Sequence, residues 1–85
     1  MNAENLRISI GQKLRRLREQ AGMSQQKLAD LAGMVQPTIY RFETGERKIN
    51  VDQARKLASV FGIAPAEFLP PDINTPAQPR TPPST

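Results

Sequence analysis

The chain has 85 residues and a formal net charge of +4, with twelve Lys or Arg against eight Asp or Glu. This length makes one small domain. The chain has no cysteine and no histidine, which excludes disulfides, thiolate metal sites and every catalytic arrangement that needs an imidazole. We therefore expect neither an enzyme nor a cofactor.

The N-terminus "MNAENLRISI" lacks the basic region and apolar core of a signal peptide. No apolar run approaches the ~20 residues that a membrane span needs. These features predict a cytoplasmic protein without a membrane partner. The basic charge favours nucleic acid as the partner, although a surface charged only for solubility is the alternative.

Composition divides the chain into three segments. Residues 1–5 are polar and unpatterned and are expected to be disordered, whereas residues 6–69 carry the apolar pattern of a folded domain. The tail 70–85, "PPDINTPAQPRTPPST", holds six of the eight prolines and is expected to be disordered. It fits either a linker from a longer protein or an arm that binds a protein partner.

Within residues 6–69 the apolar spacing is helical throughout, and no segment alternates with the period of a strand. Capping residues or prolines mark the expected helix starts, and glycines mark the ends. The starts are Ser9, Ser24, Pro37, Asn50 and Pro65, and the ends are Gly22, Gly33, Gly45 and Gly62. Ser9 and Asn50 are each followed three residues later by Gln, as in a capping box. The pattern predicts an all-α domain of five helices.

Only three residues, 33–35, separate the second helix from the third. Gly33 can adopt the positive φ that a tight bend requires. The small Ala29, one turn earlier, allows the next helix to approach closely. Such a tight helix–turn–helix is typical of DNA-reading proteins, although a plain αα-corner in a bundle uses the same glycine.

The outer face of the third helix favours DNA. Once the apolar Ile39 and Phe42 are assigned to the core, the remaining side chains are Gln36, Pro37, Tyr40, Arg41 and Thr44. Arg suits guanine and Gln suits adenine through paired hydrogen bonds, and Pro can contact a thymine methyl. We predict that Gln36, Pro37, Tyr40 and Arg41 read bases and that Thr44 is solvated; a solvated polar face is the alternative.

The stretch "GMSQQKLADLAGMVQPTIYRFETGERK" resembles the helix-turn-helix of the Cro/phage-repressor type, the XRE family. The resemblance covers about residues 8–69 and includes "SQ", "LA…AG", "QPTI", the "E-x-G" after the third helix and the later "LA…FG". It implies a compact five-helix, lambda-repressor-like domain whose third helix enters the major groove. It also implies a homodimer on a palindromic operator.

The resemblance also implies roles for particular residues. The phosphate contacts it implies are Gln25, Thr38, Arg47 and Lys48, with Asn50 adding the amides of its helix N-terminus. It implies an internal ion pair between Arg18 and Glu43. Phe68 and Leu69, in the fifth helix, form either a dimer surface or part of the core.

Four positions depart from the family pattern. Val35 stands where the family often has a Ser or Thr cap. Gln36 precedes a proline and is therefore either the N-cap or the first helical residue. Tyr40 replaces a small residue and contacts either a sugar–phosphate or a thymine methyl. Ala64 is a poor cap, so the fifth helix should fray.

The sequence therefore predicts a sequence-specific double-stranded DNA-binding transcriptional regulator, with repression as the family's commonest role. Two other functions stay open. One is an antitoxin-type regulator that also binds a protein partner through the proline-rich tail. The other is a partner-binding module that uses this fold without DNA.

Overall fold

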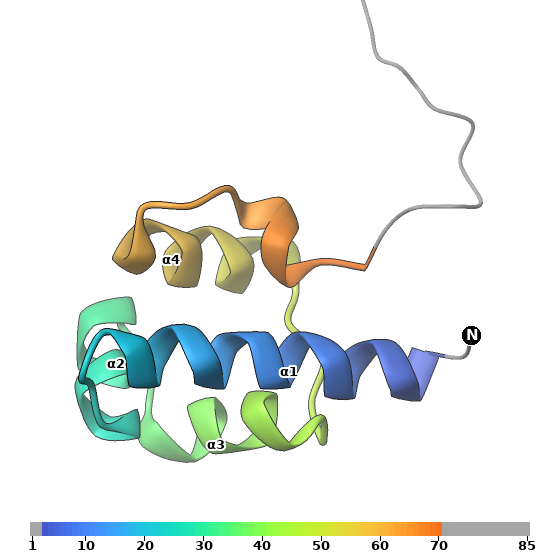
Figure 1. The fold of residues 1–85 in the computed structure, drawn as a ribbon, viewed down its shortest axis with the longest axis horizontal. Coiled ribbons are helices and arrows are strands. Elements are labelled where there is room, and N and C mark those ends of the chain that lie inside the picture. The colour runs from blue at the N-terminus through green and yellow to red at the C-terminus, as the bar shows by residue number, and fades with distance from the viewer. Residues whose placement is uncertain (1–2, 71–85) are drawn as a thin grey trace, which may run out of the picture.

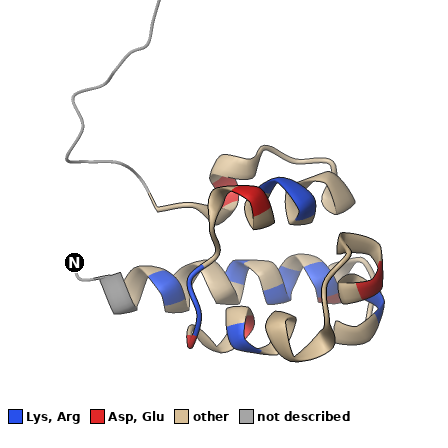
Figure 2. Ribbon diagram, turned by 180° about the vertical axis from the view of Figure 1, so that it is seen from behind, with Lys and Arg blue, Asp and Glu red and all other residues tan. Residues whose placement is uncertain are grey.

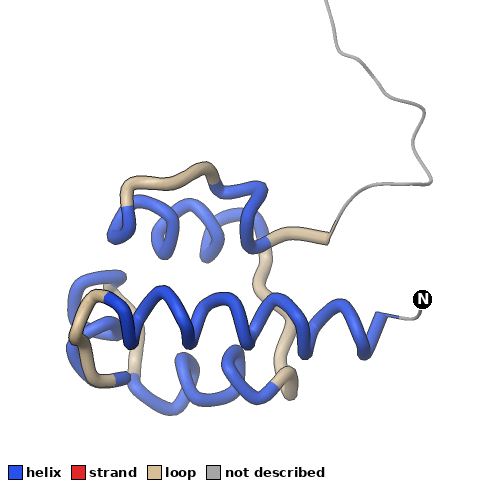
Figure 3. Tube along the Cα trace, in the orientation of Figure 1, coloured by secondary structure: helices blue, strands red, loops and turns tan. Residues whose placement is uncertain are grey.

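The computed structural model describes residues 3–70. Its elements are α1 (Ala3–Gln20), α2 (Gln25–Ala32), α3 (Gln36–Thr44), α4 (Val51–Phe61) and the 3-10 helix η1 (Pro65–Phe68). No strand occurs within residues 3–70, and the helices fold into one compact body (Figure 3). The predictions for residues 1–2 and for the tail from residue 71 on lie outside the described residues.

The helix α1 runs through the middle of the molecule, with α3 on one side and α4 with η1 on the other (Figure 1). The helix α2 contacts both α3 and α4, so it closes one end of the bundle. The largest fully buried side chains come from all four helices and η1: Leu14, Leu28, Ile39, Phe42, Leu57 and Phe68. A single core therefore fixes α3 against the rest of the domain.

The short fifth helix expected from Pro65 is a 3-10 helix of four residues, Pro65–Phe68, so the domain has four α-helices within the described residues and not five. Ala64 makes no side-chain cap hydrogen bond, in keeping with its poor capping chemistry. A single turn of 3-10 helix suffices to carry Phe68 into the core, where it is fully buried.

The start of the first helix is also corrected. Because α1 begins at Ala3, Ser9 lies in its interior and cannot form the expected capping box. Residues 3–5, expected to be disordered, are helical. Leu6 and Ile10 continue the apolar face of Leu14 towards the N-terminus, and this extra turn supports the longer helix.

The other local signals agree with the structure. The Ser24 side chain accepts a hydrogen bond from the Lys27 N–H, and Asn50 forms a reciprocal capping box with Gln53. The glycines that follow the first four helices all have positive φ: Gly22, Gly33, Gly45 and Gly62. Capping chemistry, which needs only neighbouring residues, was therefore readable from the sequence.

Phe68 belongs to the core and not to a dimer surface. Its side chain is fully buried, and its ring centroid lies 6.4 Å from that of Phe61. Leu69 is only partly buried and packs against the same cluster. The sequence left open whether Phe68 forms a dimer surface or part of the core, and the structure places it in the core.

Candidate nucleic-acid interface

The turn between α2 and α3 is fixed by backbone hydrogen bonds. Gly33 has φ 70°, a conformation that glycine adopts without a Cβ penalty. The Met34 N–H donates to the Ala29 carbonyl at 2.8 Å, and the Gly33 N–H donates to the Asp30 carbonyl at 3.3 Å. Ala29 is fully buried. The turn is therefore tight and rigid, and it places α3 directly after α2.

The helix α3 has one buried and one exposed face. Ile39 and Phe42 lie in the core, whereas Pro37, Tyr40 and Arg41 are exposed. Tyr40 keeps 48% of its surface accessible, so its ring can be reached from outside the protein. Tyr40 and Arg41 follow Pro37 by three and four positions, so the exposed residues form one stripe along the helix.

Gln36 is the first residue of α3 and not its N-cap, which is Val35 without a side-chain hydrogen bond. Its side-chain Nε2 donates to Oε1 of Gln25 at 2.7 Å, and Nε2 of Gln25 donates to Oε1 of Glu43 at 3.0 Å. Because a carboxylate only accepts, Glu43 fixes the orientation of the Gln25 amide, which in turn fixes that of Gln36. Gln36 keeps its Oε1 and one N–H for an external partner.

The ion pair expected between Arg18 and Glu43 is present. The guanidinium donates to both carboxylate oxygens, at 2.6 and 3.1 Å, and also to the Met23 carbonyl at 2.7 Å. The two side chains are only 11% and 3% exposed. The hydrogen bond to Glu43 raises the pKa of Arg18, so this residue stays charged at every working pH. The pair joins α1, the α1–α2 connection and α3.

The basic residues of α3 and of the loop that follows it make no ion pair with the described side chains. Among residues 3–70, carboxylates lie within 4 Å of Lys13, Arg15, Arg18 and Lys56. No carboxylate of the described chain lies that close to Arg41, Arg47 or Lys48. Figure 2 shows the basic stretch of loop that connects α3 with α4. These three charges are available to an external anion.

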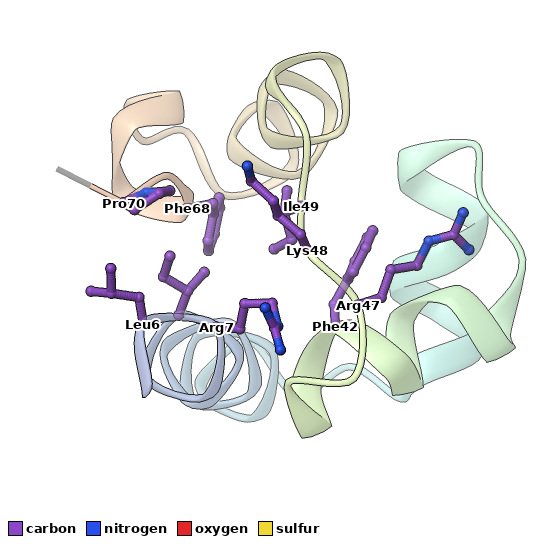
Figure 4. Close-up of a pocket in the computed structure, with 9 residues that line it drawn as sticks. Leu6, Arg7, Phe42, Arg47, Lys48, Ile49, Phe68 and Pro70 are labelled. Carbon is purple, nitrogen blue, oxygen red and sulfur yellow. The ribbon is translucent and has the colours of Figure 1, made fainter. Parts of the chain in front are cut away.

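The loop after α3 is anchored to the helix. The Arg47 N–H donates to the Arg41 carbonyl at 3.2 Å. In the view of Figure 4, the Arg47 guanidinium extends away from Leu6 and Pro70. The Asn50 side-chain oxygen is occupied by the Gln53 N–H at 2.7 Å, so an Asn50 contact to phosphate would use its helix N-terminus or its amide N–H groups.

Sequence reasoning missed two residues of α1 that set the position of α3. A Cβ at Gly11 would lie 2.2 Å from the Phe42 carbonyl oxygen and 2.8 Å from that of Glu43. Arg7 Nε donates to the Gly45 carbonyl at 3.2 Å, at the end of α3. A glycine inside an otherwise regular helical pattern is a signal of close packing, and it could have identified Gly11.

An exposed helix held behind a three-residue turn defines the class of the domain as helix-turn-helix. The chain belongs to the Cro/C1-type, or XRE, helix-turn-helix family: the family model described as "Helix-turn-helix" matches residues 14–68. This is a family of transcriptional regulators, which are generally not enzymes. The structure thus supports DNA-binding regulation as the general function.

Two of the relatives, one named as a control protein and the other as a restriction-modification controller protein, each match over more than three quarters of the chain. Control protein C.BamHI of Bacillus amyloliquefaciens is 33% identical over 66 residues, which are 76% of this chain and 82% of the relative. The crystal structure of the restriction-modification controller protein C.AhdI from Aeromonas hydrophila superimposes with a TM-score of 0.74 at 32% identity. That match covers 81% of this chain and all of C.AhdI.

A putative HTH-type transcriptional regulatory protein of Pyrobaculum aerophilum is 44% identical over 52 residues. The match covers 61% of this chain but only 21% of that relative, so it concerns one part of a longer protein. No helix within residues 3–70 is long and apolar enough to cross a membrane.

Proposed function

We propose that the protein is a sequence-specific double-stranded DNA-binding regulator that represses transcription by placing α3 in the major groove. The observation that carries the proposal is the exposed stripe of Pro37, Tyr40 and Arg41 on a helix whose inner face is held by buried contacts. A rigid helix with an accessible polar and aromatic stripe can present side chains to base edges without reordering.

In this proposal Gln36 and Arg41 supply most of the sequence preference. Arg41 has no carboxylate partner within the described chain and suits the O6 and N7 atoms of guanine. The oxygen and N–H that Gln36 keeps match the N6 and N7 edge of adenine. Pro37 contacts a thymine methyl, and Tyr40 contacts either a neighbouring methyl or the sugar–phosphate.

The phosphate contacts come from both sides of α3. We assign them to Gln25 through its second N–H, to Thr38 at the start of α3, and to Arg47, Lys48 and Asn50 beyond its end. Contacts of this kind fix the register of the protein on the duplex and do not select the sequence. Residues 47, 48 and 50 follow α3 closely, so the two sets of contacts fall on adjoining DNA.

One copy of α3 reaches only a few base pairs, so we propose a two-fold homodimer on a palindromic operator with half-sites roughly 34 Å apart. Phe68 is not available to such a dimer, whereas Leu69 remains partly exposed. An operator that overlaps a promoter would exclude the polymerase. Because C.AhdI is a restriction-modification controller, promoters of restriction-modification genes are natural duplexes to include in a test.

The proposal is tested by selecting duplexes from a random pool at roughly 150 mM salt, where nonspecific phosphate binding is weakened. Enrichment of a palindrome with fixed half-site spacing is the expected result. Enrichment of no sequence, together with no binding to any duplex at low salt, would contradict the proposal. That result would favour a module that binds a protein partner, and the proline-rich tail outside the described residues would then be the first segment to test.

Replacing Arg41 or Lys48 with alanine should separate the two kinds of contact. Arg41→Ala should lose about 1–3 kcal/mol of binding at one base position and relax the preference there. Lys48→Ala should weaken binding to all sequences alike and reduce the slope of log affinity against log salt by about one. Fluorescence anisotropy with the selected duplex and its single-base variants measures both effects. Identical behaviour of the two variants would refute this division of roles.

A further inference from the structure

A cavity of about 100 Å³ lies where α1, the loop after α3 and the end of η1 meet (Figure 4). Its walls are apolar: Leu6, Ile10, Phe42, Ile49, Phe68 and Pro70. Phe42, Ile49 and Phe68 are core residues with at most 4% of their surface exposed, so they form the apolar floor of the cavity.

Three cations line this space, Arg7, Arg47 and Lys48, and the Arg47 guanidinium extends away from Leu6 and Pro70 (Figure 4). Arg7 is partly buried and its Nε donates to the Gly45 carbonyl, a bond that does not use its two terminal NH₂ groups. Lys48 is exposed. Among the side chains that the structure describes, residues 5–70, no carboxylate comes within 4 Å of Arg7 or Lys48, although four other basic residues of the domain have such a partner.

We propose that this cavity is a binding site for a small amphiphilic anion, namely one carboxylate joined to an apolar ring or a short alkyl chain. A comparable apolar cavity of roughly 150 Å³ accommodates benzene, so about 100 Å³ holds most of one ring while the carboxylate stays at the mouth. Charge-assisted hydrogen bonds from Arg7 and Lys48 would hold the carboxylate. An apolar molecule without charge would leave these cations unused.

The site adjoins the surface that we assign to DNA. Phe42 belongs to α3, and Lys48 is one of the proposed phosphate contacts. A carboxylate bound to Lys48 neutralises a charge that DNA would otherwise use, so the ligand should weaken DNA binding. This second step rests on the proposed function, whereas binding of the ligand itself does not.

The site is tested on the full chain without DNA, by titration with benzoate followed through backbone amide NMR shifts and calorimetry. We expect saturable shifts around Leu6, Ile49 and Phe68, with a dissociation constant on the order of 1 mM or tighter. Acetate, which lacks the ring, and benzyl alcohol, which lacks the charge, should bind at least about five-fold more weakly. Equal binding of benzyl alcohol, or no saturable shift with benzoate, would overturn the proposal.

Matched variants locate the charge contact. Lys48→Met should weaken benzoate binding about ten-fold, because the carboxylate loses one of the cations proposed to hold it. Lys56→Met removes a charge from α4, where Lys56 pairs with Asp52, and should leave benzoate binding unchanged. Equal loss in both variants would show a general effect of net charge and would refute the site.

The link to DNA is measured with the selected duplex. Saturating benzoate should raise the dissociation constant for DNA at least about five-fold, whereas the same concentration of acetate should not. An unchanged dissociation constant would refute the link. If no duplex binds at all, the proposed function fails, and the titration without DNA still decides whether the cavity is a ligand site.

Discussion

Replacing Arg18 with alanine should lower the free energy of unfolding by about 3–5 kcal/mol. The variant would leave Glu43, whose side chain is 3% exposed, as a buried carboxylate without its cation. It would also remove the hydrogen bond to the Met23 carbonyl in the α1–α2 connection. Urea unfolding followed by far-ultraviolet circular dichroism measures the loss.

The matched control is Arg15→Ala. Arg15 pairs with Glu19 on the same helix, but both side chains are more than half exposed, so this loss should be below about 1 kcal/mol. A double variant with Met at both Arg18 and Glu43 should recover much of the stability, because it removes the unpaired charge as well. An Arg18→Ala variant as stable as Arg15→Ala would show that the pair does not hold α3.

The features that could be predicted from the sequence are those that depend on neighbouring residues. The Ser24 cap, the Asn50–Gln53 capping box and the Gly33 turn each involve residues at most a few positions apart. The exposed stripe of α3 also follows from spacing alone, because residues three and four apart share a helix face. These local signals sufficed for the order of the elements from α1 to α4, whereas the class of the domain came from the resemblance to the Cro/phage-repressor family.

The predictions that were wrong, and the features that no prediction covered, depend on contacts between distant parts of the chain. The packing that supports the first turns of α1 involves residues from η1 and from the loop after α3, so a local Ser9 motif placed the start incorrectly. Pro65–Phe68 needs only one turn to bury Phe68. The Gln36–Gln25–Glu43 chain of hydrogen bonds joins residues up to 18 positions apart, which no local pattern reports.

This chain of hydrogen bonds changes how Gln25 is understood. The family resemblance assigns Gln25 to a phosphate, and that contact stays a prediction. In the structure both ends of its amide are bonded inside the protein. Its position between a buried carboxylate and Gln36 means that the Arg18–Glu43 pair also bears on the orientation of a proposed base-reading side chain.

Replacing Gly11 with alanine should destabilise the domain by about 1–3 kcal/mol, although the same change inside a helix ordinarily stabilises it. The new Cβ would meet the carbonyl oxygen of Phe42 at 2.2 Å and that of Glu43 at 2.8 Å. Both atoms belong to the backbone of α3, so a side-chain rotation cannot relieve the overlap. The helices α1 and α3 would have to move apart.

Gln12→Ala is the control for Gly11→Ala, because Gln12 is the next residue of α1 and is exposed. It should change stability by less than about 0.5 kcal/mol. Urea unfolding compares the two, and duplex binding is then measured at a temperature where both variants are fully folded. A Gly11→Ala variant as stable as the parent protein would mean that α3 tolerates the displacement. Weaker binding by a fully folded Gly11→Ala variant would show instead that α1 sets the position from which α3 meets DNA. Gly11 packs against the buried face of α3, opposite Tyr40 and Arg41, so the new methyl group would make no contact with DNA itself.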